Sequence, residues 1–184
     1  ALWEGDNDLY CGAAWHYATN PEFRIGCDMQ RNTAATLAAY KQYLRLRAEG
    51  IVEGRRAAQA RGYKGVKVLT VIEFNSVRFL QEAGLPNMLD DVIPHVPSAD
   101  LYSYSAWESL GAWDIHGQLT ADMQLLQKRF GPKVFIGEFG FDRGTMDEAQ
   151  IEARISMMQC VVRDLHIPYA ILWQVFDQPP LEGL

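Results

Sequence analysis

The chain has 184 residues, of which 48% are hydrophobic and 22% are charged, and its formal net charge is -6 at pH 7. This composition is typical of a globular domain that can bury a hydrophobic core. Binding to a nucleic acid requires clustered Lys and Arg, so the acidic balance argues against that partner. No apolar run approaches the roughly 18 residues of a membrane-spanning helix, so we expect no membrane partner.

Three cysteines are too few for a disulfide scaffold, and none are spaced as Cys-x-x-Cys. Cys11 and Cys27 flank a loop-like segment, so they either form a disulfide in a secreted protein or remain two free thiols. The chain opens on a strand-like Leu2–Trp3 without an initiator methionine. We therefore expect residues 1–184 to be one domain that is truncated at its N-terminus.

Helix-like and strand-like segments alternate from residue 33 onward, which is typical of βα units and a parallel sheet. Apolar residues at helical spacing predict a long helix over 33–60, with an N-cap at Asn32 or Thr33 and a possible break at Gly50 or Gly54. The arginines of this helix are mixed with glutamates, so a solvated face is expected. The other predicted elements are a helix and loop within 77–97, strands at 66–72, 100–105, 133–137 and 168–173, and helices at 120–130 and 147–166.

Five predicted strands end near residues 3, 72, 105, 137 and 173. Five parallel strands fit a doubly wound sheet or part of an eight-stranded barrel. No Gly-x-Gly-x-x-Gly or Gly-x-x-x-x-Gly-Lys-Ser/Thr loop follows any of them, so a nucleotide-binding fold has little support. We predict an α/β fold, namely the second half of a (β/α)8 TIM barrel, with functional residues at the carboxyl ends of the strands.

Two glutamates, Glu4 and Glu138, come directly after apolar strand-like residues. Carboxyl groups in unequal surroundings can divide the roles of acid and nucleophile, as a glycosidase requires. Retaining enzymes hold the two groups about 5 to 5.5 Å apart, whereas inverting enzymes leave about 6.5 to 9.5 Å. Glu138 could instead cap a helix or pair with Arg143, and Glu4 could be an acid of a surface turn.

Glycines at 137 and 140 flank Glu138 and would let other groups approach it closely. The residues Ile-Gly-Glu-Phe-Gly at 136–140 resemble the strand-7 nucleophile motif of clan A glycoside hydrolases, especially the cellulase-like family 5. Ile-Leu-Trp-Gln at 171–174 resembles the strand-8 tryptophan segment of the same clan. By this resemblance the chain runs from strand 4 to strand 8.

The resemblance implies a retaining glycosidase (an O-glycosyl hydrolase) that cleaves a β-glycosidic bond by double displacement. Glu138 would be the nucleophile and Glu4 the acid/base. The resemblance and the aromatic pattern also give substrate-binding candidates, which are Trp3, Glu73, Asn75, Tyr104, Trp107 and Trp173. Trp113 is a further candidate for stacking on a sugar ring, and Tyr104 could support the nucleophile or pack in the core.

Two positions depart from the clan pattern. Trp3 stands where the clan usually has Asn before the acid/base, and Ser105–Trp107 replaces the His-x-Tyr found in family 5. A non-catalytic carbohydrate-binding or structural barrel therefore remains an alternative, as does another TIM-barrel enzyme that uses Glu138.

The expected partner is an oligosaccharide or polysaccharide. We expect no cofactor and no metal, because none of the four histidines lies at a metal-ligand spacing. Secretion or a periplasmic location is favoured over the cytoplasm, since polysaccharide substrates lie outside the cell. The sugar, its linkage, endo or exo action and the oligomeric state are left open.

Overall fold

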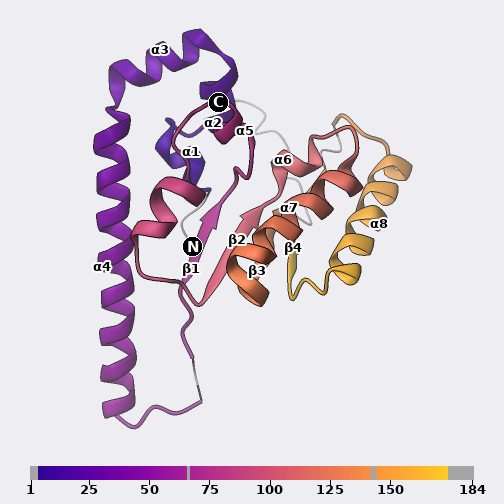
Figure 1. The fold of residues 1–184 in the computed structure, drawn as a ribbon. Coiled ribbons are helices and arrows are strands. Elements are labelled where there is room, and N and C mark those ends of the chain that lie inside the picture. The colour runs from indigo at the N-terminus through magenta and orange to yellow at the C-terminus, as the bar shows by residue number, and fades with distance from the viewer. Residues whose placement is uncertain (1–3, 66, 142–143, 174–184) are drawn as a thin grey trace, which may run out of the picture. The chain divides into compact units, whose positions relative to one another are not determined.

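The structure, a computed structural model, describes residues 4–65, 67–141 and 144–173. It is 60% helical and contains a small parallel sheet of four strands (Figure 1). The chain divides into two compact units, Ala1–Ser103 and Tyr104–Leu184, and the boundary falls within strand β2. The single catalytic domain stays a prediction.

The first unit begins with helices where the sequence suggested a loop. Its helices are α1 (Gly5–Leu9), α2 (Ala14–Thr19), α3 (Pro21–Gln30) and α4 (Thr33–Ala60). After β1 (Val71–Phe74) come α5 (Phe79–Glu82), a π-helical turn (Met88–Val92) and a 3-10 turn (Ile93–His95). A disulfide between Cys11 and Cys27 joins the turn after α1 to α3, whereas Cys160 is a free thiol.

Helix α4 has the bounds that the apolar spacing predicts. The Asn32 side chain accepts a hydrogen bond from Ala35 N at 3.1 Å, which confirms one of the two predicted N-caps. Gly50 and Gly54 do not interrupt the helix. Tyr40 and Leu44 are its buried residues, so only a narrow stripe of α4 contributes to the core.

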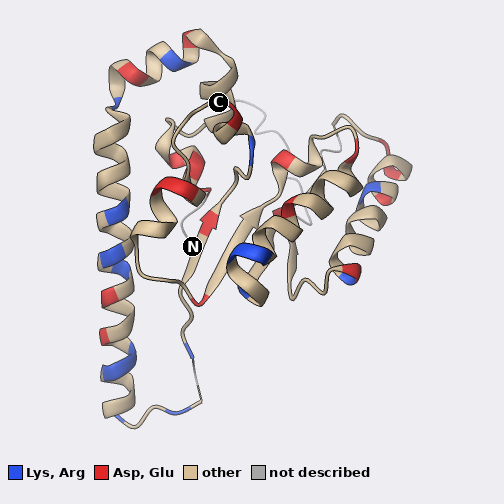
Figure 2. Cartoon of the chain, viewed as in Figure 1, with Lys and Arg blue, Asp and Glu red and all other residues tan. Residues whose placement is uncertain are grey.

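Along α4 two glutamates, Glu49 and Glu53, lie between two groups of basic residues (Figure 2). Three of its arginines nevertheless bind backbone carbonyls instead of only forming a solvated face. Arg45 donates to His95 O at 2.8 Å, Arg47 donates to Val71 O at 2.8 Å, and Arg55 donates to Val68 O. These bonds fasten the long helix to β1, to the segment before it and to the 3-10 turn at Ile93–His95.

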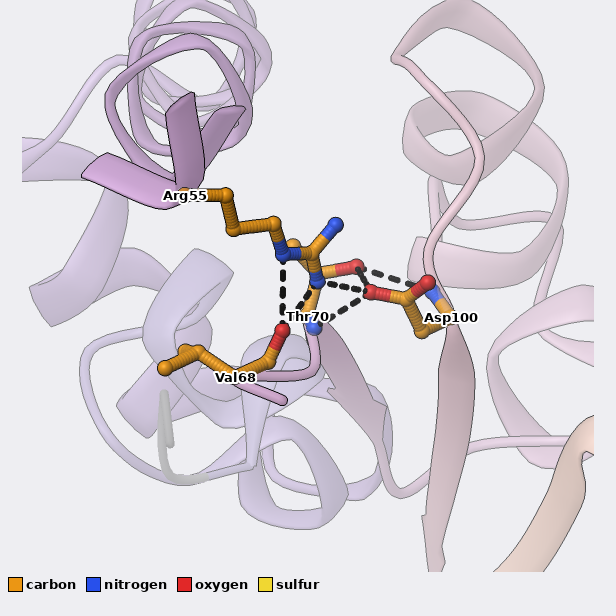
Figure 3. Close-up of polar contacts among 4 residues, drawn as sticks. All are labelled: Arg55, Val68, Thr70 and Asp100. Atoms are coloured by element: carbon orange, nitrogen blue, oxygen red, sulfur yellow. Dashed lines mark hydrogen bonds and ion pairs between the residues drawn. The ribbon is translucent and has the colours of Figure 1, made fainter. Parts of the chain in front are cut away.

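The carboxylate of Asp100 joins three segments of the first unit (Figure 3). Its Oδ2 accepts hydrogen bonds from Thr70 N at 2.8 Å and Thr70 Oγ1 at 2.9 Å, and it pairs with Arg55 Nη2 at 2.5 Å. Asp100 N in turn donates to Thr70 Oγ1 at 2.8 Å. The backbone and hydroxyl donors of Thr70 and the guanidinium of Arg55 hold the pKa of Asp100 well below its usual range.

The second unit alternates strands and helices. Strand β2 (Leu101–Ser105) leads into α6 (Trp107–Leu110) and α7 (Ile115–Phe130), and a 3-10 turn (Gly131–Lys133) precedes β3 (Val134–Phe139). Helix α8 (Glu148–Asp164) and β4 (Ala170–Leu172) follow. Helices α7 and α8 pack together and bury Leu119, Met123, Leu126, Met158 and Val161.

Several element ends differ from the predicted ones. Val68 and Leu69 are exposed, and β1 begins only at Val71, after which the chain is buried through Phe74. Helix α7 begins five residues before the predicted Thr120, because the Asp114 side chain caps it by accepting from Gly117 N. Helix α8 starts where the sequence predicts it, and Asp147 caps it with a capping box.

The predicted half of a (β/α)8 TIM barrel is wrong. The four strands lie in the order β1-β2-β3-β4, and Ile136 on β3 pairs in parallel with Ala170 on β4. The described residues before β1 are mainly helical. Alternating strands and helices produce open parallel sheets as well as barrels, so the sequence pattern could not separate the two. An α/β fold is consistent with the structure.

The decrease in the free energy of unfolding at acidic pH should depend on Asp100. Its folded-state pKa lies below the unfolded value, so its contribution is full above about pH 5 and is lost as the pH falls through and below about 4. Urea unfolding of Asp100→Asn should show a loss of about 1 kcal/mol at pH 7, since the side chains of Arg55 and Asp100 are 30% and 31% exposed.

This difference between wild type and Asp100→Asn should shrink as the pH is lowered from 5 to 3. The control is Asp164→Asn, because Asp164 pairs with Arg163 at a site where its side chain is 57% exposed. The control should change stability less at every pH. An equal loss in both variants, or a loss independent of pH, would contradict the assigned role of Asp100.

Candidate functional site

Glu4 stands at the N-cap of α1 in a strained backbone conformation. Its φ of 45° and ψ of 71° lie in the left-handed region, which costs a non-glycine residue roughly 1 to 2 kcal/mol. The side chain is buried, and its Oε2 accepts a hydrogen bond from Asn7 Nδ2. Asn7 Oδ1 also accepts from Ala14 N at 2.8 Å, so the amide that contacts Glu4 is itself fixed.

Asp6 fastens α1 to the carboxyl end of β1. Its carboxylate is fully buried, and Oδ2 accepts hydrogen bonds from Asn75 N and Ser76 N, each at 3.0 Å. Oδ1 accepts a third bond from Met88 N at 2.7 Å. These donors belong to backbone that has left the strand, so the carboxylate satisfies groups that would otherwise be buried without partners.

Glu73 and Asn75 lie at the end of β1, and both are buried. Gly5 packs directly against this segment, because a Cβ atom on it would lie 2.8 Å from Glu73 O. The Asn75 Oδ1 atom is buried and has no hydrogen-bond partner among the described residues. Through Gly5 and Asp6, the structure thus brings Glu4 to the strand end that carries Glu73 and Asn75.

Glu138 lies near the carboxyl end of β3 in the second unit, and its side chain is buried. Its Oε2 accepts a hydrogen bond from Trp107 Nε1 at 3.1 Å. The backbone of the same residue is also held, since Glu138 O accepts from Ala106 N at 2.9 Å. An indole N–H can only donate, so this contact fixes the orientation of one carboxyl oxygen of Glu138.

Gly140 is the position where other groups come closest to the Glu138 segment. A Cβ atom on Gly140 would clash with Trp173 O and would lie 3.2 Å from Trp107 Cη2. Trp173 N also donates to Phe139 O at 2.7 Å, so the end of β4 follows that of β3. The predicted close approach beside Glu138 is confirmed at Gly140, and the side chain of Trp173 is itself exposed.

Tyr104 is fully buried on β2. Its hydroxyl forms a 2.8 Å hydrogen bond with Ser109 Oγ, which donates to Asp122 Oδ2 at 2.7 Å. Burial raises the pKa of Tyr104 well above its usual value. This placement favours the alternative in which Tyr104 packs in the core.

The predicted site residues divide between the two units. Glu4, Glu73 and Asn75 belong to the first unit, while Tyr104, Trp107, Glu138 and Trp173 belong to the second. The pairing of Glu4 with Glu138 stays a prediction. Trp113 is fully exposed. The predicted strand end at Leu2–Trp3, the Arg143 alternative and Gln174 lie outside the described residues.

Asp6 and Asn7 were not among the predicted site residues. The sequence around them, Glu-Gly-Asp-Asn-Asp, has the composition of a surface turn, and nothing in it marks Asp6 as buried. The signal that could have revealed the contact is Gly5, since a glycine beside an acid can mark a close approach to backbone.

In the parts of the chain that the structure describes, no group of three or more His, Cys, Asp or Glu side chains is arranged to hold a metal ion. Across the same ranges, no helix has both the length and the apolar character to cross a membrane.

Comparisons with known protein families, with curated proteins and with solved structures found no match. The resemblance to clan A glycoside hydrolases therefore stays a prediction, made from the short motifs at 136–140 and 171–174.

The contact of α1 with β1 should tolerate no side chain at residue 5. In Gly5→Ala, the new Cβ would meet Glu73 O at 2.8 Å and Met88 Cε at 2.9 Å, so we expect a loss of about 1 to 3 kcal/mol in the free energy of unfolding. The matched control is Gly26→Ala on α3, where no atom lies within 4 Å. It should be neutral or stabilise by up to about 1 kcal/mol. Equal urea midpoints for both variants would contradict the packing at Gly5.

Proposed function

We propose that this protein is a retaining glycoside hydrolase that cleaves a β-glycosidic bond, with Glu138 as its nucleophile. The observation that supports this most strongly is the arrangement around Glu138, a buried carboxylate near the carboxyl end of a parallel strand that accepts an indole N–H. In parallel α/β sheets, ligands bind outside the carboxyl ends of the strands. The proposal depends on this placement and on the motif at 136–140, and it does not require a closed barrel.

In the first chemical step, a carboxylate oxygen of Glu138 attacks the anomeric carbon and the bond to the leaving oxygen breaks. The acid/base residue supplies the proton that the leaving oxygen takes up. In the second step, the same residue removes a proton from water, which attacks the anomeric carbon and releases Glu138. No external oxidant, reductant or cofactor enters this balance.

Glu4 is our proposed acid/base. The side chain of Glu4 is buried, and its Oε2 accepts a hydrogen bond from Asn7 Nδ2, so its carboxyl group is held in one place. Its left-handed backbone is the kind of stored strain that is typical of functional positions. Glu73, at the strand end that Gly5 contacts, is the nearest rival for the same role.

The exposed ring of Trp173 follows β4, where it could stack on a sugar as the sequence predicts. The disulfide between Cys11 and Cys27 supports the further proposal that the protein acts outside the cytoplasm, because such bonds persist in oxidising compartments. A polysaccharide or oligosaccharide substrate agrees with that location.

The nucleophile is tested with Glu138→Gln. The amide oxygen can still accept from Trp107, so the fold should hold, while hydrolysis of aryl β-glycosides should fall roughly 10³-fold or more. Release of aryl alcohol is followed, and circular dichroism monitors folding. The matched control, Glu152→Gln on the exposed face of α8, should retain full activity.

Near-wild-type turnover by Glu138→Gln would exclude Glu138 as the nucleophile. If wild type binds β-linked oligosaccharides but forms no product, the alternative of a non-catalytic carbohydrate-binding protein gains support.

The acid/base is tested by comparing substrates with good and poor leaving groups. Glu4→Ala should lose roughly 10²- to 10⁴-fold in glycosylation of unactivated oligosaccharides but far less with a dinitrophenyl leaving group, which departs without a proton. Glu73→Ala is the comparison variant, since Glu73 is also buried. A leaving-group dependence that appears in Glu73→Ala and not in Glu4→Ala would transfer the role to Glu73.

A further inference from the structure

We propose that Trp107 is a positioning residue for Glu138, which it orients through its indole N–H. The sequence marked Trp107 as a candidate for stacking on a sugar, but the structure directs the polar edge of its ring to the carboxylate, with Nε1 3.1 Å from Glu138 Oε2. This inference rests on the proposed function, because it assigns Trp107 a part in the same reaction.

The backbone places Trp107 beside Glu138. Trp107 is the first residue of α6, directly after β2, and the preceding Ala106 N donates to Glu138 O at 2.9 Å. This bond fixes the end of β2 against Glu138 at the point where the chain turns into α6. The position of the Trp107 Cα atom relative to the carboxylate is therefore set by main-chain hydrogen bonding.

The far end of the indole ring is fixed by Gly140. The ring atom Cη2 would lie 3.2 Å from a Cβ on Gly140, so the ring packs against bare backbone there. The ring is thus held at its six-membered side by Gly140 and at its N–H side by Glu138. A ring confined at both ends loses little further freedom when the carboxylate reacts, which is the condition for a preorganised donor.

The chemistry of an indole suits this role. Its N–H is a donor only and has no acceptor, so Trp107 cannot take up a proton from the carboxyl group. Among the described residues, Trp107 is the only side chain that bonds the Glu138 carboxylate, and it bonds Oε2. The other oxygen, Oε1, is left for attack on the anomeric carbon.

Trp107→Phe separates positioning from stacking, because phenylalanine keeps an aromatic face and loses the N–H. We expect kcat on aryl β-glycosides to fall roughly 10-fold or more, with KM changed less than about twofold. The matched control is Trp15→Phe, the same substitution at an exposed tryptophan of α2 that has no part in the proposed site, which should leave kcat unchanged. An unchanged kcat for Trp107→Phe, or a rise in KM alone, would overturn the proposal in favour of a stacking role.

A second measurement tests the contact without relying on activity. The indole ¹H–¹⁵N cross-peak of Trp107 can be assigned by its loss in Trp107→Phe. In Glu138→Gln this cross-peak should move, because a neutral amide oxygen is a weaker acceptor than a carboxylate, and in Glu152→Gln it should stay in place. A cross-peak that Glu138→Gln does not move overturns the pairing, whether or not the protein is an enzyme.

Failure of the two proposals can therefore be told apart. A wild-type protein that hydrolyses no β-glycoside overturns the proposed function and the catalytic consequence of Trp107, while a shift of the cross-peak would still establish the bond. Activity that requires Glu138 but is indifferent to Trp107→Phe overturns only the positioning role.

Discussion

The candidate residues of the first unit, Glu4, Glu73 and Asn75, depend for their placement on the hydrogen bonds that the buried carboxylate of Asp6 accepts. Burying a charge is costly unless hydrogen bonds compensate it, and here three backbone N–H groups do so, from Asn75, Ser76 and Met88. The same bonds hold α1 against the end of β1, which in turn requires residue 5 to lack a Cβ atom. Glu4, with its left-handed backbone, directly precedes this fixed helix.

In the second unit, main-chain hydrogen bonds hold the segments around the carboxyl group of Glu138. Ala106 N binds Glu138 O, and Trp173 N binds Phe139 O, so the chain segments around the carboxylate are aligned before any side-chain contact is considered. Backbone alignment of this kind is insensitive to side-chain identity except where space is short. That exception is Gly140, where the carbonyl of Trp173 occupies the space of a side chain.

Features that neighbouring residues determine could be predicted from the sequence, whereas features that depend on tertiary contacts could not. Helix α4 and its Asn32 cap were predictable, because apolar spacing and capping are properties of neighbouring residues. The start of β1 was not, since Val68 and Leu69 have strand-like side chains but lie exposed. The burial of Asp6 could not be predicted either, because its three donors come from residues at least 69 positions away. The barrel was predicted from the alternation of strands and helices, which open parallel sheets show as well.

Because the predicted barrel is wrong, the proposed function is supported by the site and not by the fold. A fold alone never establishes an activity, because activity belongs to a site that many folds can carry. The closed barrel would have supplied only an analogy, whereas the buried carboxylate of Glu138, its indole donor and the strained Glu4 are properties of this chain. Both glutamates adjoin the end of a parallel strand, Glu4 through Gly5 and Glu138 directly, and such ends bind ligands in open sheets as well. The proposed hydrolysis therefore depends on these two carboxyl groups and does not require a closed barrel.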